Sequence, residues 1–312
     1  MAMDETLIIT GCAGFIGSHV TDHFLSNGYT VVGYDAFTYA GKMENLKFAT
    51  SHPKFTLVEG SINDTKLLDE MVRNHNAKWI VNLAAETHVD NSIKSCDVFL
   101  QTNVLGTKSV LDVCRNTGVK LLHFSTDEVY GVPFGWHSFK EDASLNPKNP
   151  YSASKAAADH LIMAYANTYG LQCIIVRPSN NFGPRQHDEK FLPKMIKNLL
   201  AGKKIPVYGD GSQIREWTFV KTTAAATRFI LENSKMNETY NITTGEFMRN
   251  IDVVNRVCEM VQVHAPDFIE YVPDRLGHDF RYSINADKLK RLGFELCDEF
   301  KKRLWETIQE TQ

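Results

Sequence analysis

The chain has 312 residues, of which 43% are hydrophobic, so it can bury a large core in one α/β unit or in two joined domains. A net charge of −3 without a dense lysine or arginine run argues against a nucleic-acid partner. The acidic start leads into a predicted strand without a secretory signal, and no apolar run approaches the roughly 20 residues that cross a bilayer. The six scattered cysteines suit neither a disulfide framework nor a metal site. We therefore expect a cytoplasmic protein with no membrane partner and no metal.

Short apolar runs alternate with helix-length segments along the first half of the chain. Such runs, rich in valine, leucine and isoleucine, are typical of parallel strands that are buried on both faces. The sequence therefore predicts an α/β protein with a doubly wound parallel sheet. The predicted strands are residues 6–10, 30–34, 55–58, 79–83, 120–124 and 171–176.

A glycine-rich loop follows the first predicted strand and precedes a helix predicted over 16–25. Gly11, Gly14 and Gly17 have the Gly-x-x-Gly-x-x-Gly spacing, which permits a tight turn and brings backbone N–H groups close to a pyrophosphate. Asp35 ends the second strand, where a carboxylate accepts hydrogen bonds from ribose hydroxyls and repels a 2′-phosphate. The alternative is that Asp35 only caps the next segment. The pattern favours a Rossmann-type domain that binds NAD rather than NADP.

The regular alternation loosens after about residue 178, where glycine and proline become frequent. We expect residues 1–180 to form mainly the NAD-binding domain and residues 181–312 mainly a smaller, irregular substrate-binding cap. A segment of about 215–245 is expected to return to the NAD-binding domain.

Two neighbouring carboxyl groups, Asp127 and Glu128, follow the strand predicted over 120–124. Adjacent acidic residues are common on solvated surfaces. These two, however, emerge at the carboxyl end of a buried strand, which is where ligands bind in open α/β sheets. They are therefore candidate catalytic groups.

Tyr151 and Lys155 are four residues apart at the start of a predicted helix, so they share one helix face. A tyrosine titrates near 10 and is a poor base at neutral pH unless a cation stabilises its phenolate. Lys155 and a positive nicotinamide ring can provide that charge. A surface pair on an amphipathic helix is the alternative, but the dinucleotide loop in the same chain favours catalysis.

These motifs resemble the extended short-chain dehydrogenase/reductases that act on nucleotide sugars, and within them the nucleoside-diphosphate-hexose 4,6-dehydratases. The resemblance extends over nearly the whole chain. It rests on the glycine loop, the Tyr151-x-x-x-Lys155 pair and the segments Leu83–Asp90, Ser125–Gly131, Ser179–Pro184, Tyr208–Arg215 and Asp274–Asp279.

The resemblance implies a mechanism with transient oxidation. Tyr151, assisted by Thr126 and Lys155, takes the proton from the hydroxyl on sugar carbon 4 while hydride passes to NAD. Glu128 then removes the proton on carbon 5, Asp127 protonates the departing hydroxyl on carbon 6, and hydride returns to carbon 6. The product is a 4-keto-6-deoxy sugar, and NAD stays tightly bound and is regenerated.

The resemblance also implies ligand-binding residues. Arginines suit a diphosphate because the planar guanidinium matches phosphate oxygens. The residues expected to bind NAD are Gly11, Gly14, Phe15, Ile16, Gly17, Asp35, Ser61, Ile62, Leu83, Ala84, Ala85, Tyr151, Lys155 and Asn180. Those expected to bind the nucleoside-diphosphate-hexose are His88, Asn181, Lys190, Tyr208, Arg215, Asn250, Arg275 and His278.

Several positions depart from the family pattern and leave the substrate open. Ser61 stands where an aspartate is common, Asn91 replaces a frequent arginine, and Arg185 adds a positive charge. dTDP-glucose is the expected substrate, and UDP-glucose and UDP-N-acetylglucosamine are alternatives. A nucleotide-sugar 4-epimerase and a non-catalytic dinucleotide-binding protein are the rival functions. Apolar positions on two long helical segments, 97–117 and 151–169, predict a homodimer.

Overall fold

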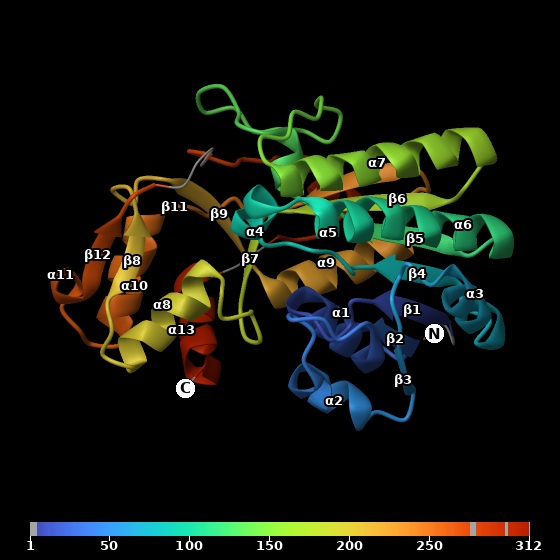
Figure 1. Ribbon diagram of the computed structural model, residues 1–312, viewed down its shortest axis with the longest axis horizontal. Helices are drawn as coiled ribbons and strands as arrows, with labels where there is room; N and C mark the ends of the chain where they lie inside the picture. Colours follow the sequence, from blue (N-terminus) through green and yellow to red (C-terminus); the bar gives the residue numbers. More distant parts are fainter. Residues whose placement is uncertain (1–4, 275–278, 297–298, 312) are drawn as a thin grey trace.

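The computed structural model describes residues 5–274, 279–296 and 299–311 of the chain. Figure 1 shows a large sheet with helices on both sides and, beside it, a smaller group of helices and short strands. We call the first part the sheet domain and the second the cap.

The sheet domain is built on seven parallel strands in the order β10-β6-β5-β4-β1-β2-β3. The order reverses between β1 and β4, and this reversal places a ligand-binding crevice at the carboxyl ends of the strands. The arrangement confirms the predicted doubly wound, Rossmann-type fold. The strands are β1 Thr6–Thr10, β2 Thr30–Asp35, β3 Phe55–Glu59, β4 Trp79–Asn82, β5 Lys120–Phe124, β6 Cys173–Pro178 and β10 Glu238–Ile242.

Helices cover both faces of this sheet, as Figure 1 shows. One apolar core joins the sheet to α1 (Phe15–Ser26) and α9 (Val220–Asn233). A second core, on the other face, joins it to α3 (Thr65–Asn74), α6 (Thr107–Thr117) and α7 (Pro150–Tyr169). Because both faces are covered, the strands carry apolar residues almost without interruption.

The helical segment that ends in α6 has an irregular middle. Residues Asp97–Phe99 form α5, Leu100–Gly106 form the π-helix η2, and α6 follows directly. Within η2 the Asn103 side chain accepts from the Glu86 N–H, and it donates to the Glu86 carbonyl and to Ser154 Oγ. The wider π-helical turn thus accompanies bonds to the segment after β4 and to α7. Such turns are frequent at functional sites.

The cap has its own apolar core, formed by two small sheets and four helices. The strands β7, β9 and β11 form one sheet, and β8 and β12 form the other. The cap elements are β7 Asn180–Phe182, β8 Ile205–Tyr208, β9 Ile214–Phe219, β11 Phe247–Arg249, β12 Ile269–Val272, α8 Phe191–Leu200, α10 Asn250–Met260, α11 Ala265–Phe268 and α13 Phe300–Thr311.

The chain passes between the two parts more than once. After β9 it enters α9 and then β10, which pairs with β6 at the edge of the large sheet. Later, α12 (Asp287–Leu292) packs beside β10. The remaining short elements are η1 Met43–Leu46, α2 Lys47–Thr50, α4 Val89–Lys94 and η3 Asp127–Tyr130. Within the described ranges, no helix has the length and apolar character needed to span a membrane.

Candidate active site

The glycine loop between β1 and α1 is packed too closely for side chains. Gly11 has φ +68°, and a Cβ placed there would lie 2.7 Å from the Ala84 nitrogen. A Cβ on Gly17 would lie 2.0 Å from the Gly11 carbonyl oxygen. Gly14 is the N-cap of α1, so the free N–H groups of the first helical turn follow the loop. This is the geometry that binds a phosphate group at a helix N-terminus.

Asp35 ties the end of β2 to this loop. Its carboxylate accepts hydrogen bonds from the Ala13 N–H, at 2.8 Å, and from the Phe37 N–H, at 2.9 Å. Burial raises the pKa of Asp35, and the two backbone N–H bonds oppose that change. The acid therefore lies at the strand end where the sequence predicts it, beside the loop.

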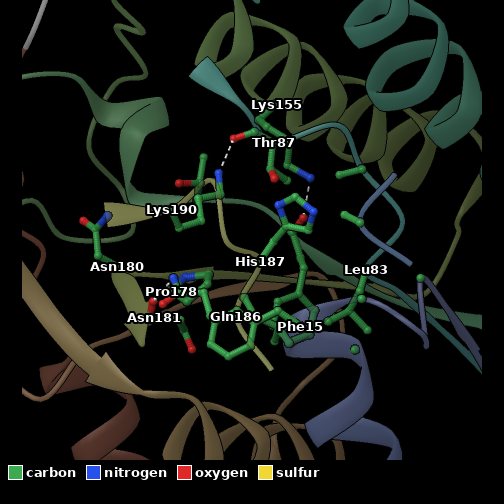
Figure 2. Close-up of a pocket in the computed structure, with 18 of the residues that line it drawn as sticks. Phe15, Leu83, Thr87, Lys155, Pro178, Asn180, Asn181, Gln186, His187 and Lys190 are labelled. Atoms are coloured by element: carbon green, nitrogen blue, oxygen red, sulfur yellow. Dashed lines mark hydrogen bonds between the residues drawn. The ribbon is translucent and has the colours of Figure 1, made fainter. Parts of the chain in front are cut away.

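A cavity of about 270 Å³ opens at the carboxyl ends of the strands and joins the glycine loop to the carboxylate pair. Figure 2 shows that both the sheet domain and the segment after β7 contribute to its wall. Its lining residues are Gly11, Gly14, Phe15, Ile16, Gly17, Ala40, Leu83, Ala85, Thr87, Phe124, Ser125, Thr126, Asp127, Glu128, Tyr151, Lys155, Pro178, Ser179, Asn180, Asn181, Gln186, His187, Glu189 and Lys190.

Asp127 begins the short 3-10 helix η3 after β5, and Thr126 caps that helix. The Thr126 hydroxyl donates to Asp127 Oδ1 at 3.1 Å, whereas Asp127 Oδ2 is buried and has no hydrogen-bond partner within the described part of the chain. Burial raises the pKa of Asp127 well above its usual value, and the nearby charges of Glu128 and Glu216 add to the rise. The raised pKa favours the protonated form of Asp127, which is the form that a general acid requires.

Glu128 has different surroundings from its neighbour. It is half-buried, and its Oε2 atom accepts from Asn149 Nδ2 at 3.2 Å and from the Tyr282 hydroxyl at 3.3 Å. Asn149 caps α7, and the single proton of the Tyr282 hydroxyl is shared between Glu128 and Asp279 Oδ2, which lies nearer at 2.6 Å. Sequence reasoning missed both partners because they lie in distant segments and carry no motif of their own.

Tyr151 and Lys155 lie in the first turns of α7. A capping box between Asn149 and Ser152 fixes this helix start, and Pro150 is its first residue. Burial and the charge of Glu128 raise the pKa of Tyr151, while a hydrogen bond from Thr126 opposes the rise. The phenolate therefore requires positive charge in the cavity.

Lys155 is also buried, and its Nζ donates to the Phe124 carbonyl at 2.5 Å. Burial lowers the pKa of Lys155 to about 8, and Asp159 partly offsets this. Lys155 therefore lies on the same face of α7 as Tyr151, and its amine contacts the end of β5.

The segment after β7 closes the cavity from the cap side. Lys190 Nζ donates to the Thr87 carbonyl at 2.9 Å, and Figure 2 shows this bond across the cavity wall. Asn181 Oδ1 and Gln186 Oε1 are buried without a hydrogen-bond partner among the described residues. Sequence reasoning did not select Gln186. Unpaired buried acceptors of this kind are costly unless a ligand binds them.

Other predicted ligand residues lie outside the lining of this cavity. Ser61 is exposed at the end of β3, Ile62 belongs to the apolar core under α3, and the Ala84 N–H donates to Thr10. His88 caps α4, and its ring lies 3.7 Å from the Glu189 carboxylate.

The substrate-binding residues predicted in the cap also lie on several different elements. Tyr208 ends β8 and Asn250 begins α10. The Arg215 guanidinium donates to the carbonyls of Asp279 and Phe280 and stacks over the Tyr282 ring. Arg275 and His278 lie outside the described residues. The site assignments as a whole remain predictions.

A bound dinucleotide fits this arrangement. The glycines permit the close backbone packing of the loop, the helix N-terminus offers N–H groups, and the orphaned Asn180 Oδ1 lies buried in the cavity lining. No cluster of three or more His, Cys, Asp or Glu side chains suited to a metal ion occurs in residues 5–274, 279–296 and 299–311.

The fold and the cavity define an α/β protein of the dinucleotide-binding class with two adjacent carboxyl groups in its cavity. The family model described as GDP-mannose 4,6 dehydratase matches residues 8–306, and the chain belongs to this family. This match confirms the resemblance to nucleotide-sugar 4,6-dehydratases.

Individual relatives agree with the family assignment. The chain is 45% identical over 291 residues to the low-salt glycan biosynthesis protein Agl12 of Haloferax volcanii, with 93% of each chain covered. It is 40% identical over 322 residues to dTDP-glucose 4,6-dehydratase of Xanthomonas campestris pv. campestris, which covers 97% of this chain and 92% of the relative. The crystal structure of DesIV, a dTDP-glucose 4,6-dehydratase from Streptomyces venezuelae with NAD bound, superposes with a TM-score of 0.94 at 38% identity, covering 98% of this chain and 96% of DesIV.

Proposed function

We propose that the protein is an NAD-dependent hydro-lyase that converts a nucleoside-diphosphate-hexose, with dTDP-glucose as the best candidate, to its 4-keto-6-deoxy product and water. The Asp127–Glu128 pair carries this proposal, because burial raises the pKa of Asp127 and favours its protonated form, whereas Glu128 is only half-buried in the cavity that Tyr151 also lines. A 4-epimerase expels no hydroxyl group and needs no such acid. The names of the relatives support dTDP-glucose as the substrate.

The glycine loop is the proposed binding site for the NAD pyrophosphate, with Asp35 at the ribose and Asn180 in the cavity lining. NAD bound there would supply the hydride acceptor for carbon 4 and the hydride donor for carbon 6. Leu83, Ala85, Phe15 and Ile16 are apolar lining residues that exclude water from the bound cofactor. Ser61, Ile62 and Ala84 remain assigned to the cofactor on sequence grounds.

Three side chains act at the carbon 4 hydroxyl in this proposal. Tyr151 takes the hydroxyl proton as a phenolate, and Thr126 orients the hydroxyl by hydrogen bonding. Lys155 lies one helical turn from Tyr151 and contributes positive charge when protonated. This positive charge is necessary because burial raises the pKa of Tyr151 and so disfavours its phenolate form.

The two carboxyl groups carry out the elimination. Glu128, oriented by Asn149 and Tyr282, removes the proton on carbon 5. Asp127 then donates a proton from its unpaired oxygen, Oδ2, to the leaving hydroxyl on carbon 6. Water is lost, which leaves Glu128 protonated and Asp127 ionised. Glu128, after proton exchange with solvent, then protonates carbon 5 as hydride is added to carbon 6, and Asp127 regains a proton from solvent.

The cap and the facing loops bind the nucleoside diphosphate in this proposal. Asn181, Lys190 and Gln186 line the cavity and offer polar atoms to the substrate. His88, Tyr208, Arg215 and Asn250, together with Arg275 and His278, stay assigned to the substrate on sequence grounds. The proposed division of the chain is 1–180 and 181–312, with about 215–245 belonging to the first part, as β10 in the large sheet supports.

A cytoplasmic homodimer completes the proposal. Exposed apolar side chains on α5, η2 and α7 support self-association. The described cysteines are all free, which suits a reducing compartment.

Mass spectrometry of reactions with dTDP-glucose, UDP-glucose and UDP-N-acetylglucosamine tests the proposal. We expect dTDP-glucose to give a product lighter by one water, and one solvent deuterium at carbon 5 when the reaction runs in heavy water. Water loss only from a UDP-sugar would move the assignment to that substrate. Unchanged mass with all three substrates would refute dehydration, and inversion at carbon 4 without mass change would identify an epimerase.

A further inference from the structure

A line of buried polar side chains crosses the sheet beneath the cavity and ends at Lys155. Thr10 of β1 pairs in register with Asn82 of β4, and Asn82 pairs with His123 of β5. His123 lies next to Lys155 of α7. All four side chains are at most 3% exposed, so each needs a partner inside the protein.

The distances between neighbouring polar atoms indicate a continuous series of hydrogen bonds. The Ala84 N–H donates to Thr10 Oγ1 at 3.3 Å, and the Thr10 hydroxyl donates to Asn82 Oδ1 at 2.5 Å. Asn82 Nδ2 lies 3.1 Å from His123 Nδ1, and His123 Nε2 lies 3.4 Å from Lys155 Nζ.

The short contact between Thr10 and Asn82 sets the direction of the other hydrogen bonds. A separation of 2.5 Å suits an O–H···O bond and is too short for an N–H···O bond, so the Thr10 hydroxyl donates to Asn82 Oδ1 while its oxygen accepts from the Ala84 N–H. The Asn82 amide therefore presents its N–H₂ group to His123 Nδ1, which must accept. A neutral His123 then carries its proton on Nε2, directed at the Lys155 amine. Burial and the charge of Lys155 lower the pKa of His123, which keeps this ring neutral.

The other charged groups around Lys155 have partners of their own. Asp159, one turn further along α7, is paired with Arg177 of β6 at 3.0 Å and accepts from Ser125 at 2.9 Å. Tyr151 lies one turn before Lys155. Asp159 favours the ammonium form of Lys155, whereas an Nε2–H donor on His123 favours the neutral amine, which alone can accept a hydrogen bond.

We propose that His123, oriented by Asn82 and Thr10, is a positioning residue that donates from Nε2 to Lys155 and favours its neutral amine. This inference rests on the proposed function, in which Lys155 acts beside Tyr151. Its consequence is a lysine that exchanges a proton near neutral pH instead of remaining a permanent cation.

Nitrogen NMR of the NAD-loaded enzyme, labelled at histidine and lysine, tests the proposal without turnover. Ring-nitrogen shifts distinguish the two tautomers, and we expect Nε2–H for His123. A proton on Nδ1 would overturn the proposal. Because this measurement needs no substrate, its outcome is independent of whether the enzyme dehydrates a sugar.

Substitutions then test the effect on Lys155. His123→Phe keeps a ring but removes the donor, so the Lys155 Nζ titration should move up by about one pH unit, a tenfold change in its proton equilibrium. The part of the pH–kcat profile that depends on the titration of Lys155 should move by the same amount, and KM should change little. His123→Gln restores an N–H near the Nε2 position and should restore both values.

The exposed His160 of α7 supplies a matched control, and His160→Phe should leave the Lys155 titration unchanged. If His123→Phe does not fold, Asn82→Asp provides a second variant, since an aspartate accepts from His123 Nδ1–H and turns Nε2 into an acceptor. It should also raise the Lys155 titration. An unmoved Lys155 titration in whichever of these two variants folds would show that His123 only fills the core.

Discussion

Two adjacent carboxyl groups that follow β5 lie in different surroundings, and that difference supports their proposed roles. Asp127 is buried, keeps one oxygen without a partner among the described residues, and has a raised pKa. Glu128 is half-buried and accepts from Asn149 and Tyr282. Unequal burial of two carboxyls is a general way to obtain an acid and a base at one pH.

Glu128→Gln separates the oxidation from the elimination. The amide keeps the shape of the side chain but cannot remove the carbon 5 proton, so water loss should slow by about 10²- to 10⁴-fold, the range of general acid–base contributions. Oxidation at carbon 4 should persist, because Tyr151 is unchanged. Stopped-flow absorbance of the reduced nicotinamide should show a single-turnover rise without decay. Simultaneous loss of the rise and of product would contradict the role of Glu128.

Glu216→Gln should move the alkaline limb of the rate profile. Glu216 is fully buried on β9, and its charge helps to raise the pKa of Asp127. Asp127 acts in its protonated form, so removing that charge lowers the pKa of Asp127 and activity should be lost at lower pH than in the wild type. A kcat profile measured from pH 6 to 10 checks this. Glu270→Gln, an exposed substitution on β12, should leave the limb in place.

The same substitution should change how stability depends on pH. Burial raises the pKa of Glu216 from 4.5 to about 7, so the folded state loses stability as the pH rises through this range. The difference of 2.5 units corresponds to about 3 kcal/mol at most. Urea unfolding at pH 4 and pH 8 should therefore show Glu216→Gln gaining stability relative to the wild type as pH rises. A constant difference between the two proteins would contradict this.

At the scale of elements, local patterns predicted the glycine loop and six strands of the large sheet to within two residues at either end, but not the seventh strand, β10. The spacing of apolar residues and the amino-acid composition are local properties of the sequence, and they are enough to predict β1, α1 and the start of α7. The π-helical turn of η2 was not predictable, because it accompanies bonds between Asn103 and the distant Glu86 and Ser154. The partners of Glu128 were missed for the same reason. The contacts of Arg215 with backbone carbonyls likewise depend on how the cap folds.

The turn from β1 to α1 should not tolerate a methyl group. Gly17→Ala places a Cβ within 2.0 Å of the Gly11 carbonyl oxygen, so the loop must shift. We expect NAD affinity to fall by at least about a hundredfold, as the misplacement of a binding loop can cost. Isothermal titration of the NAD-free protein measures this. Ser26→Ala, at the exposed end of the same helix, should bind NAD like the wild type.

At the scale of the whole molecule, the sheet domain and the cap meet across the cavity. Lys190 donates to the Thr87 carbonyl, and Tyr39 donates to Glu189 at 3.4 Å while its ring packs edge-on against His187. These contacts place cap residues over the cavity that contains Tyr151 and the carboxylate pair. Enclosure of this kind excludes water, which strengthens the electrostatic interactions used in catalysis.

The helices on one side of the sheet carry the surface that we expect to form the homodimer. Figure 1 shows α5, α6 and α7 side by side, and the exposed apolar side chains on this surface include Val98, Leu100, Leu105, Met163 and Tyr169. Several exposed apolar side chains on neighbouring helices are the kind of surface that favours association, which supports the proposed homodimer.

Replacing both Leu100 and Leu105 by arginine should convert a dimer to a monomer. Burying an unpaired charge at an interface costs several kcal/mol, so the dissociation constant should rise by at least about a hundredfold. Light scattering coupled to size exclusion measures the mass directly. Tyr271→Arg is the control, because it changes an exposed large hydrophobic residue on β12 of the cap and should leave the mass unchanged. A wild-type monomer, or an undiminished dimer of the double variant, would show that this helical face does not mediate self-association.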